Sequence, residues 1–215
     1  MMFHNRIDAG KQLGQTLAQR TLADKPDTLV LGIPRGGVVV AAEVAKALNA
    51  PFDIVVTKKI SAPGNPEYAI GAVNLDGRAV WNEPEVSRFG LTVPKKKELA
   101  KKTLDSARDK DRALRQGTQA LDLGSKTVIV VDDGVATGYS ARSALQYVRA
   151  RFPKRLVLAV PVAAPDALRD LTAYADATIA LETPDNFGAV GAFYEDFTQV
   201  DDEQVRTLLF SRSNY

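Results

Sequence analysis

The 215-residue sequence contains no cysteine and only one histidine, His4. Without cysteine, the chain cannot form a disulfide framework, a cysteine-ligated metal site or a thiol nucleophile. A chain of this length buries enough apolar surface to fold without such cross-links. The stability of the fold must therefore come from its core, and any chemistry must come from acidic, basic and hydroxyl side chains and from the backbone.

Long apolar runs and a strong charge of either sign are also missing. No run approaches the roughly 20 residues that a membrane-spanning helix needs, and the first residues carry charges where a signal peptide would be apolar. The 28 basic and 26 acidic residues give a net charge of only +2, which does not favour nucleic acid as a partner. We therefore expect a cytoplasmic protein without membrane or nucleic-acid partners.

Apolar segments typical of strands alternate with segments typical of helices. This alternation predicts an α/β fold, doubly wound, with a mainly parallel sheet covered on both faces. The expected core strands are 28–33, 52–57, 126–133, 155–162 and 177–181. Between them, residues 58–67 carry two prolines and a glycine and are predicted to form a loop. Residues 68–73 and 78–81 are predicted to form short strands. Residues 94–115 are predicted to form an exposed charged helix.

The most informative segment is 128–145, VIVVDDGVATGYSARSAL. An apolar strand ends in two carboxylates, Asp132 and Asp133, at the edge where parallel sheets bind ligands. Two adjacent carboxylates repel each other unless a cation or hydroxyl donors lie beside them. Mg²⁺ would supply the cation, and a ribose diol would supply the hydroxyl donors. The small-residue loop then leads into a helix whose first N–H groups can hold a phosphate. The pattern indicates a ribose 5-phosphate site, although an acidic pair before a capped helix would also produce it.

A second glycine-rich turn occurs in 32–41, GIPRGGVVVA, again between a strand and a helix. Arg35 stands beside Gly36 and Gly37, so a guanidinium lies next to accessible backbone N–H groups. This combination suits a diphosphate. The alternative is a strand-to-helix turn with a surface arginine.

Together these segments resemble the type I phosphoribosyltransferase family, whose signature is an apolar strand, two acidic residues, a small-residue loop and T-G-x-T/S. VIVV, Asp132–Asp133, GVA and TGYS match each part. The resemblance implies that the acidic pair holds the ribose hydroxyls and Mg²⁺, that 134–140 holds the 5-phosphate, and that the loop at 34–37, often with a strained cis peptide, holds the pyrophosphate. It also implies a mobile loop near 58–67 that closes over the site.

The resemblance predicts a single domain over 1–215, with a core of about 28–181, a hood from 1–10 and 182–215, and a charged helical insertion at 82–122. The implied reaction transfers the 5-phosphoribosyl group from phosphoribosyl pyrophosphate to an unidentified nitrogenous small-molecule acceptor, with Mg²⁺ as cofactor. Assembly into a homodimer is compatible with the sequence, which does not fix the oligomeric state. The expected catalytic residues are Arg35, Lys58, Asp132 and Asp133, and the expected binding residues are Pro34, Gly36, Gly37, Lys59, Gly134, Val135, Ala136, Thr137, Gly138, Tyr139 and Ser140.

Two other functions are compatible with these residues. One is a regulatory protein that binds phosphoribosyl pyrophosphate or a nucleotide without transferase activity. The other is a phosphorolytic or hydrolytic enzyme acting on a related phosphosugar or nucleotide. Candidate acceptor contacts lie near the chain ends, at Phe3, His4, Arg6, Phe187, Phe193, Tyr194 and Phe197.

Overall fold

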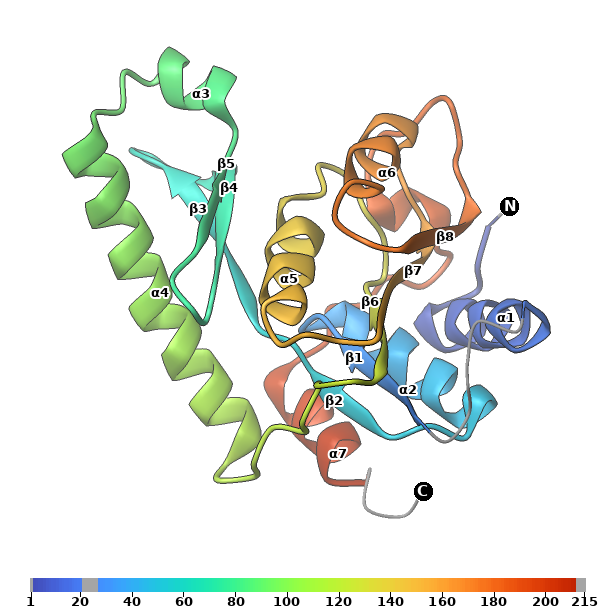
Figure 1. The fold of residues 1–215 in the computed structure, drawn as a ribbon. Helices are drawn as coiled ribbons and strands as arrows, with labels where there is room; N and C mark the ends of the chain where they lie inside the picture. The colour runs from blue at the N-terminus through green and yellow to red at the C-terminus, as the bar shows by residue number, and fades with distance from the viewer. Residues whose placement is uncertain (1, 21–26, 212–215) are drawn as a thin grey trace.

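A five-stranded parallel sheet forms the body of the protein, as the computed structural model of residues 2–20 and 27–211 shows (Figure 1). The strand order is β2-β1-β6-β7-β8, and every neighbouring pair is parallel. The bounds are Thr28–Gly32 for β1, Phe52–Ile54 for β2, Thr127–Val131 for β6, Arg155–Val162 for β7 and Ala177–Glu182 for β8. Both β1 and β6 are buried along their whole length, which explains their uninterrupted apolar sequences. The predicted α/β class is confirmed.

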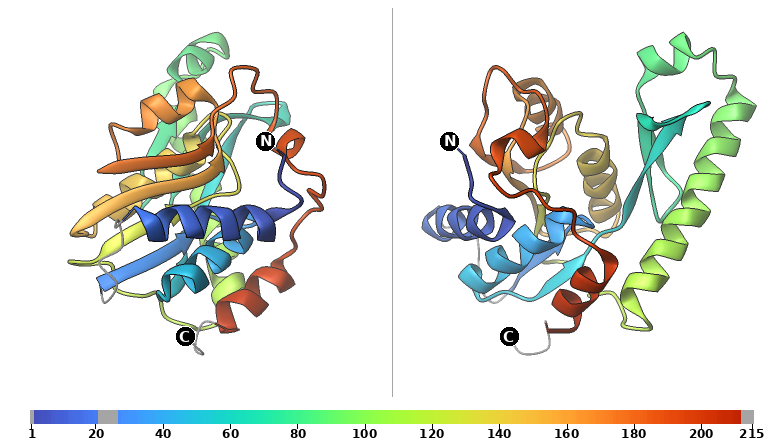
Figure 2. Two further views of the ribbon diagram at one scale, coloured as in Figure 1. Left: turned by 90° about the vertical axis from the view of Figure 1, so that its right-hand side faces the viewer. Right: turned by 180° about the vertical axis from the view of Figure 1, so that it is seen from behind.

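Helices cover both faces of this sheet (Figure 2). Because side chains alternate along a strand, Val30 and Ile129 pack toward one set of helices while Leu29 and Val128 pack toward the other. The first set is α1 (Arg6–Gln19), α2 (Gly36–Leu48) and α7 (Asp202–Ser211), and the second is α5 (Tyr139–Arg149) and α6 (Pro165–Leu171). Within the described residues, no helix combines the length and apolar character needed to cross a bilayer.

Residues 57–115 form a separate projection, which we call the arm. It combines a three-stranded antiparallel sheet, β3-β4-β5, with two helices (Figure 1). The arm has its own small core, in which Ile60, Ile70 and Val73 pack against Leu99 and Leu104. Its elements are β3 (Thr57–Ala62), β4 (Asn65–Asn74), β5 (Ala79–Trp81), α3 (Glu83–Arg88) and the long α4 (Val93–Arg115).

The prediction of a loop at residues 58–67 is wrong, because these residues belong to the β3–β4 hairpin. Lys58 pairs with Val73 and Lys59 with Ala72 in an antiparallel ladder. The Pro and Gly residues on which the prediction rested lie at the tip, where Gly64 has φ +76°, and at the irregular start of β4. Turn-forming residues mark the reversal correctly, but they do not reveal how far the strands extend on either side of it.

The carboxyl-terminal end of α4 is anchored to the body by a buried ion pair. Asp53 of β2 is 1% exposed. It accepts hydrogen bonds from Arg115 Nη1 at 2.8 Å and from the Leu121 N–H at 2.8 Å. Arg115 Nη2 also donates to the Ile54 carbonyl at 3.0 Å. Because every charged group here has a partner, the pair fixes where the arm leaves the sheet.

We expect Arg115→Met to lower the free energy of unfolding by about 3–5 kcal/mol, because it leaves Asp53 buried without its cation. Urea denaturation followed by circular dichroism measures this change. Arg112→Met is the matched control, since Arg112 pairs with Asp109 on the surface of the same helix, where an ion pair contributes about 1 kcal/mol or less. Equal effects of the two substitutions would contradict the anchoring role of Arg115.

The two ends of the chain meet over one edge of the body, in a segment we call the hood (residues 2–5 and 187–198). Phe3 and Tyr194 form a parallel bridge, in which the Phe3 N–H donates to the Phe193 carbonyl at 2.8 Å and the Glu195 N–H to the Phe3 carbonyl at 2.9 Å. Phe3 is fully buried. Helix α7, which the sequence placed with the hood, instead packs against α2 and the body core.

His4 offers a probe of this junction, since its ring Nδ1 lies 2.8 Å from Glu195 Oε2. The Glu195 carboxylate raises the pKa of His4 above the ordinary value of 6.5. The pair therefore stabilises the hood below about pH 6.5, and this contribution is lost as the pH rises through the folded-state pKa. NMR titration of the imidazole signals should give a pKa above 6.5 that falls toward it in Glu195→Gln. An unchanged pKa in that variant would disprove the contact.

Candidate active site

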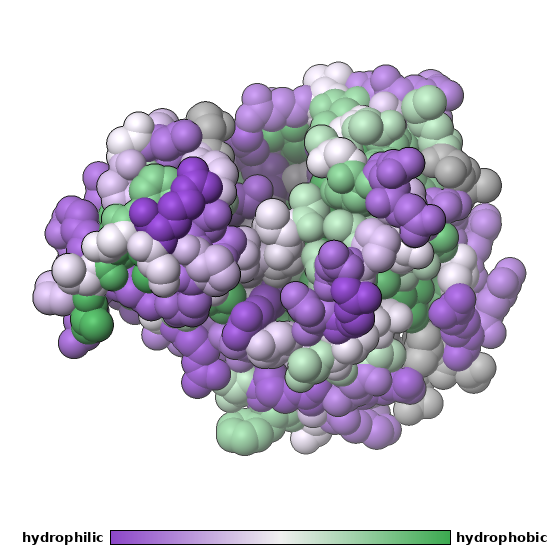
Figure 3. Space-filling view, turned by 90° about the horizontal axis from the view of Figure 1, so that it is seen from above, coloured by the Kyte–Doolittle hydropathy of each residue, from purple (hydrophilic) through white to green (hydrophobic). Residues whose placement is uncertain are grey.

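An open cavity of about 310 Å³ lies beyond the carboxyl ends of β1 and β6. The molecular surface is hollowed between the arm and the body when seen from above (Figure 3). Four separate parts of the chain contribute: the loop after β1, the loop after β6, the arm and the hood. The lining consists of Ile33, Pro34, Arg35, Gly36, Lys59, residues 132–141, Val190 and Phe197.

The predicted acidic pair stands at the rim of this cavity, directly after β6. Both carboxylates are half-buried, and the Asp133 N–H donates to Asp132 Oδ1 at 2.9 Å. Burial and the neighbouring Asp133 carboxylate raise the pKa of Asp132 well above its ordinary value. Such a carboxyl is destabilised in its charged form, so a cation or a hydroxyl donor placed beside it would be favoured.

Asp133 is held by Arg6, the first residue of α1. Arg6 Nε donates to Asp133 Oδ2 at 2.7 Å, and Arg6 Nη1 donates to the Thr198 carbonyl at 2.9 Å. The guanidinium also lies over the Phe197 ring, 3.8 Å from its centroid. The sequence placed Arg6 only among hood candidates; nothing in the sequence connects it with an acid 127 positions away.

Glycine is required at position 36 because of this ion pair. A Cβ atom on Gly36 would lie 1.8 Å from Asp133 Oδ2 and 2.6 Å from Arg6 Nε, so any side chain would collide with the pair. The loop after β1 and the loop after β6 thus touch at the acidic residues.

The hood is bonded to the acidic loop through Tyr194. Its hydroxyl donates to the Asp133 carbonyl oxygen at 2.5 Å, and burial raises its pKa so that it stays protonated. The Tyr194 ring packs between Phe3 and Phe197, with ring centroids 5.4 and 5.0 Å away. Val190 and Phe197 complete one apolar wall of the cavity. Phe197 is among the candidate acceptor contacts expected from the sequence, whereas Val190 is not.

The loop after the acidic pair leads directly into α5. Its base is fixed because the Val135 N–H donates to the Val162 carbonyl at 2.9 Å and Val135 accepts from the Ala164 N–H at 2.8 Å. Gly138 is the residue before the helix, with φ +77°, and no side chain of the described residues caps the helix there. The first N–H groups of a helix have no partner within it. Because Gly138, Tyr139 and Ser140 line the cavity, these donors are placed where they could hold an anion.

Two cationic residues, Arg35 and Lys59, line the same cavity as the acidic pair. A cis peptide bond joins Pro34 and Arg35, as the resemblance implied for this loop. The Arg35 guanidinium lies 3.9 Å from Asp202 of α7, and Lys59 enters from the arm.

The structure brings the predicted site residues together, with two exceptions. Gly37 lies behind the site, where a Cβ atom would be 2.8 Å from Asp132 Cα. Lys58 points to the opposite face of β3 from Lys59 and donates a hydrogen bond to Ser106 of α4. Adjacent residues of a strand face opposite sides, so the two lysines cannot both reach the cavity.

Metal binding at this site would rest on two carboxylates. Among the residues that the structure describes, no group of three or more acidic or histidine side chains could hold an ion by itself. Mg²⁺ is commonly bound through one or two carboxylates together with substrate phosphates and water. The donor set therefore fits an ion that arrives with a phosphate ligand and does not fit a cage built from protein alone.

Known proteins share this architecture. The crystal structure of TT1426 from Thermus thermophilus superposes with a TM-score of 0.81 and 42% sequence identity, covering 98% of this chain and 99% of that one. Two curated proteins from two strains of Mycobacterium tuberculosis, named "Putative phosphoribosyl transferase", are each 41% identical over 208 residues, or 97% of this chain. The chain spans 46% of the length of these two relatives.

The family model described as "Phosphoribosyl transferase domain" matches residues 5–198. This range contains the acidic pair, both loops, the whole arm and most of the hood. The chain therefore belongs to the phosphoribosyl transferase domain family.

Proposed function

We propose that this protein transfers the 5-phosphoribosyl group of phosphoribosyl pyrophosphate to a nitrogenous small-molecule acceptor, with release of pyrophosphate. The observation that carries the proposal is the set of groups that line the cavity at the strand ends. There an acidic pair, a helix amino terminus and two cationic residues line one cavity. A ribose that carries one phosphate and one diphosphate needs these three kinds of partner.

Each wall of the cavity has a part in this reaction. Asp132 and Asp133 accept hydrogen bonds from the ribose hydroxyls, and Arg6 keeps Asp133 oriented. The loop 134–140 and the first N–H groups of α5 hold the 5-phosphate. Arg35 and Lys59 hold the diphosphate from the other side. When bound, Mg²⁺ would neutralise charge on the departing pyrophosphate, with Asp132 and Asp133 as the protein residues available to hold it.

The bond between ribose C1 and the pyrophosphate oxygen breaks, and a bond from the acceptor nitrogen to C1 forms. The pyrophosphate leaves with the electron pair, and the acceptor nitrogen loses a proton. Positive charge develops on the ribose, as in other displacements at a sugar carbon, and the nearby carboxylates stabilise it electrostatically. The apolar surface of Val190 and Phe197 leaves the hood side of the cavity for the acceptor.

The acidic pair provides the first test. In Asp132→Asn with Asp133→Asn, affinity for phosphoribosyl pyrophosphate with Mg²⁺ should fall by about 100-fold or more, since two charge-assisted hydrogen bonds are lost. Isothermal titration calorimetry measures the affinity. Asp105→Asn with Asp109→Asn removes two exposed carboxylates from α4 and should leave it unchanged. Unaltered affinity in the first variant would refute the site assignment.

Pyrophosphate release separates the two functions that share this site. The wild-type protein is incubated with phosphoribosyl pyrophosphate, Mg²⁺ and a panel of nitrogenous bases and amines, and released pyrophosphate is assayed enzymatically. Acceptor-dependent release that disappears in the acidic-pair variant supports the transferase. Tight binding without release for any acceptor would support the regulatory protein instead.

The two adjacent lysines make a second test with a built-in control. Lys59→Ala should weaken phosphoribosyl pyrophosphate binding by about 10- to 100-fold, the loss of one charged contact to the diphosphate. Lys58→Ala removes the same charge one residue away, on the other face of β3, and should change the affinity less than about threefold. Isothermal titration calorimetry on both variants measures the two affinities. Similar losses of affinity would contradict the assignment of Lys59 alone to the site and would mean that the hairpin rearranges on binding.

A further inference from the structure

The arm contains a second and larger cavity, of about 500 Å³, between the β3–β4 hairpin and α4. We call it the arm cavity. Lys58, Lys59 and Lys102 line it together with hydroxyl groups of Ser61, Thr103 and Ser106. The role proposed for the active site does not use it, except that Lys59 lines both cavities.

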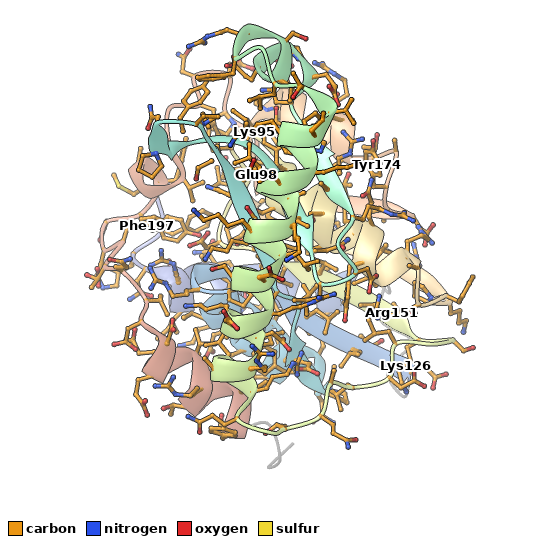
Figure 4. All side chains as sticks on the ribbon, turned by 90° about the vertical axis from the view of Figure 1, so that its left-hand side faces the viewer. Lys95, Glu98, Lys126, Arg151, Tyr174 and Phe197 are labelled. Atoms are coloured by element: carbon orange, nitrogen blue, oxygen red, sulfur yellow. The ribbon has the colours of Figure 1, made fainter. Side chains whose placement is uncertain are left out.

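The lysines of the arm cavity differ from most other lysines of α4, with Lys97 as an exception, in having no carboxylate partner among the described residues. Elsewhere on that helix, Lys95, Lys96, Lys101 and Lys110 each contact a carboxylate within 3.0 Å, and Figure 4 labels Lys95 and its partner Glu98. In the part of the chain that the structure describes, none of the three cavity lysines forms such an ion pair, and the lining contains no acidic residue. Two ammonium groups, those of Lys58 and Lys102, stand at this cavity without a carboxylate partner among the described residues, and they favour an anion.

The remainder of the arm cavity is apolar. Leu99, Ala62, Pro63 and Pro66 contribute to its wall, and Leu99 also packs on the core of the arm. Its volume lies in the usual range for small-molecule sites, which combine an apolar surface with a few placed polar groups.

We propose that the arm cavity binds a small-molecule anion in which a phosphate or carboxylate is joined to an apolar body. The anionic group contacts Lys58 and Lys102, and the apolar part lies against Leu99. Lys58 donates one hydrogen bond to Ser106, and its ammonium carries two further donors for the ligand.

The shared lysine couples the two cavities, a step that rests on the proposed function of the active site. An anion in the arm cavity and the diphosphate both attract the single Lys59 ammonium, which lines both cavities, so the two ligands compete for it. Each ligand should therefore weaken the binding of the other by the same factor. The arm cavity thereby gives a metabolite of this class a means to inhibit the use of phosphoribosyl pyrophosphate.

Methyl NMR locates a ligand directly, because each cavity carries its own methyl groups. Leu99 and Ala62 report on the arm cavity, and Ile33 and Val190 on the active site. Phenyl phosphate is the probe, with benzyl alcohol as an uncharged compound of similar size. Titration should shift the Leu99 and Ala62 signals to saturation with phenyl phosphate and much less with benzyl alcohol. Shifts confined to Ile33 and Val190 would overturn the proposal.

Matched charge removals test the lysines. Lys58→Ala with Lys102→Ala should weaken the phenyl phosphate response of Leu99 by about 10-fold or more, as two charged contacts are lost. Lys97→Ala with Lys101→Ala removes two exposed charges from α4 outside the arm cavity and should leave the response unchanged. Equal weakening in both variants would show general attraction to a basic surface and no site. Unshifted methyl signals in the body core establish that the variants are folded.

The coupling is measured in the same titration. Saturating phosphoribosyl pyrophosphate and Mg²⁺ should weaken the phenyl phosphate response of Leu99, and Lys59→Ala should remove this effect. If phosphoribosyl pyrophosphate fails to shift Ile33 and Val190, the proposed function fails while the arm-cavity result stands. If it shifts them and the Leu99 response stays unchanged, the coupling through Lys59 is wrong.

Discussion

The ion pair between Arg6 and Asp133 is the interaction on which the rest of the site depends. Two adjacent carboxylates repel each other, and Arg6 gives one of them a partner at 2.7 Å. The same guanidinium binds the Thr198 carbonyl and lies on the Phe197 ring. One side chain thus joins the start of α1, the acidic loop and the carboxyl-terminal part of the hood. Without it, the hood would keep only the Tyr194 hydroxyl as a hydrogen bond to that loop, among the contacts that the structure describes.

The arm supplies Lys59 to the site, and the position of the arm follows from two buried contacts. Asp53 and Arg115 fix the lower end of α4 against β2, while Ala107 and Leu114 of the same helix enter the core of the body. Asp202 extends this connection, because it accepts a hydrogen bond from Lys110 of α4 at 2.5 Å and lies 3.9 Å from Arg35. Charges on the arm and in the loop after β1 are therefore linked through one carboxylate of α7.

A β-hairpin in place of a loop changes how cations can be supplied to the cavity. On a paired strand, neighbouring side chains face opposite sides, so Lys59 faces the strand-end cavity and Lys58 faces α4. A mobile loop could present either lysine. On the hairpin only Lys59 lines the strand-end cavity, whereas both lysines line the arm cavity, so the two cavities share Lys59.

The sequence by itself determined the features that rest on contiguous residues. Uninterrupted apolar runs that alternate with helical segments predict a parallel sheet. The order of strand, acidic pair, small-residue loop and helix places Asp132, Asp133 and residues 134–140 at one edge of that sheet, because a strand and the turn after it leave little conformational choice. Tertiary structure decided the rest: the extent of the β3–β4 hairpin, the direction of each lysine, and the meeting of Arg6 with Asp133 and of Phe3 with Tyr194. These contacts join residues far apart in the chain, and the packing of whole elements selects them, so no local pattern could reveal them.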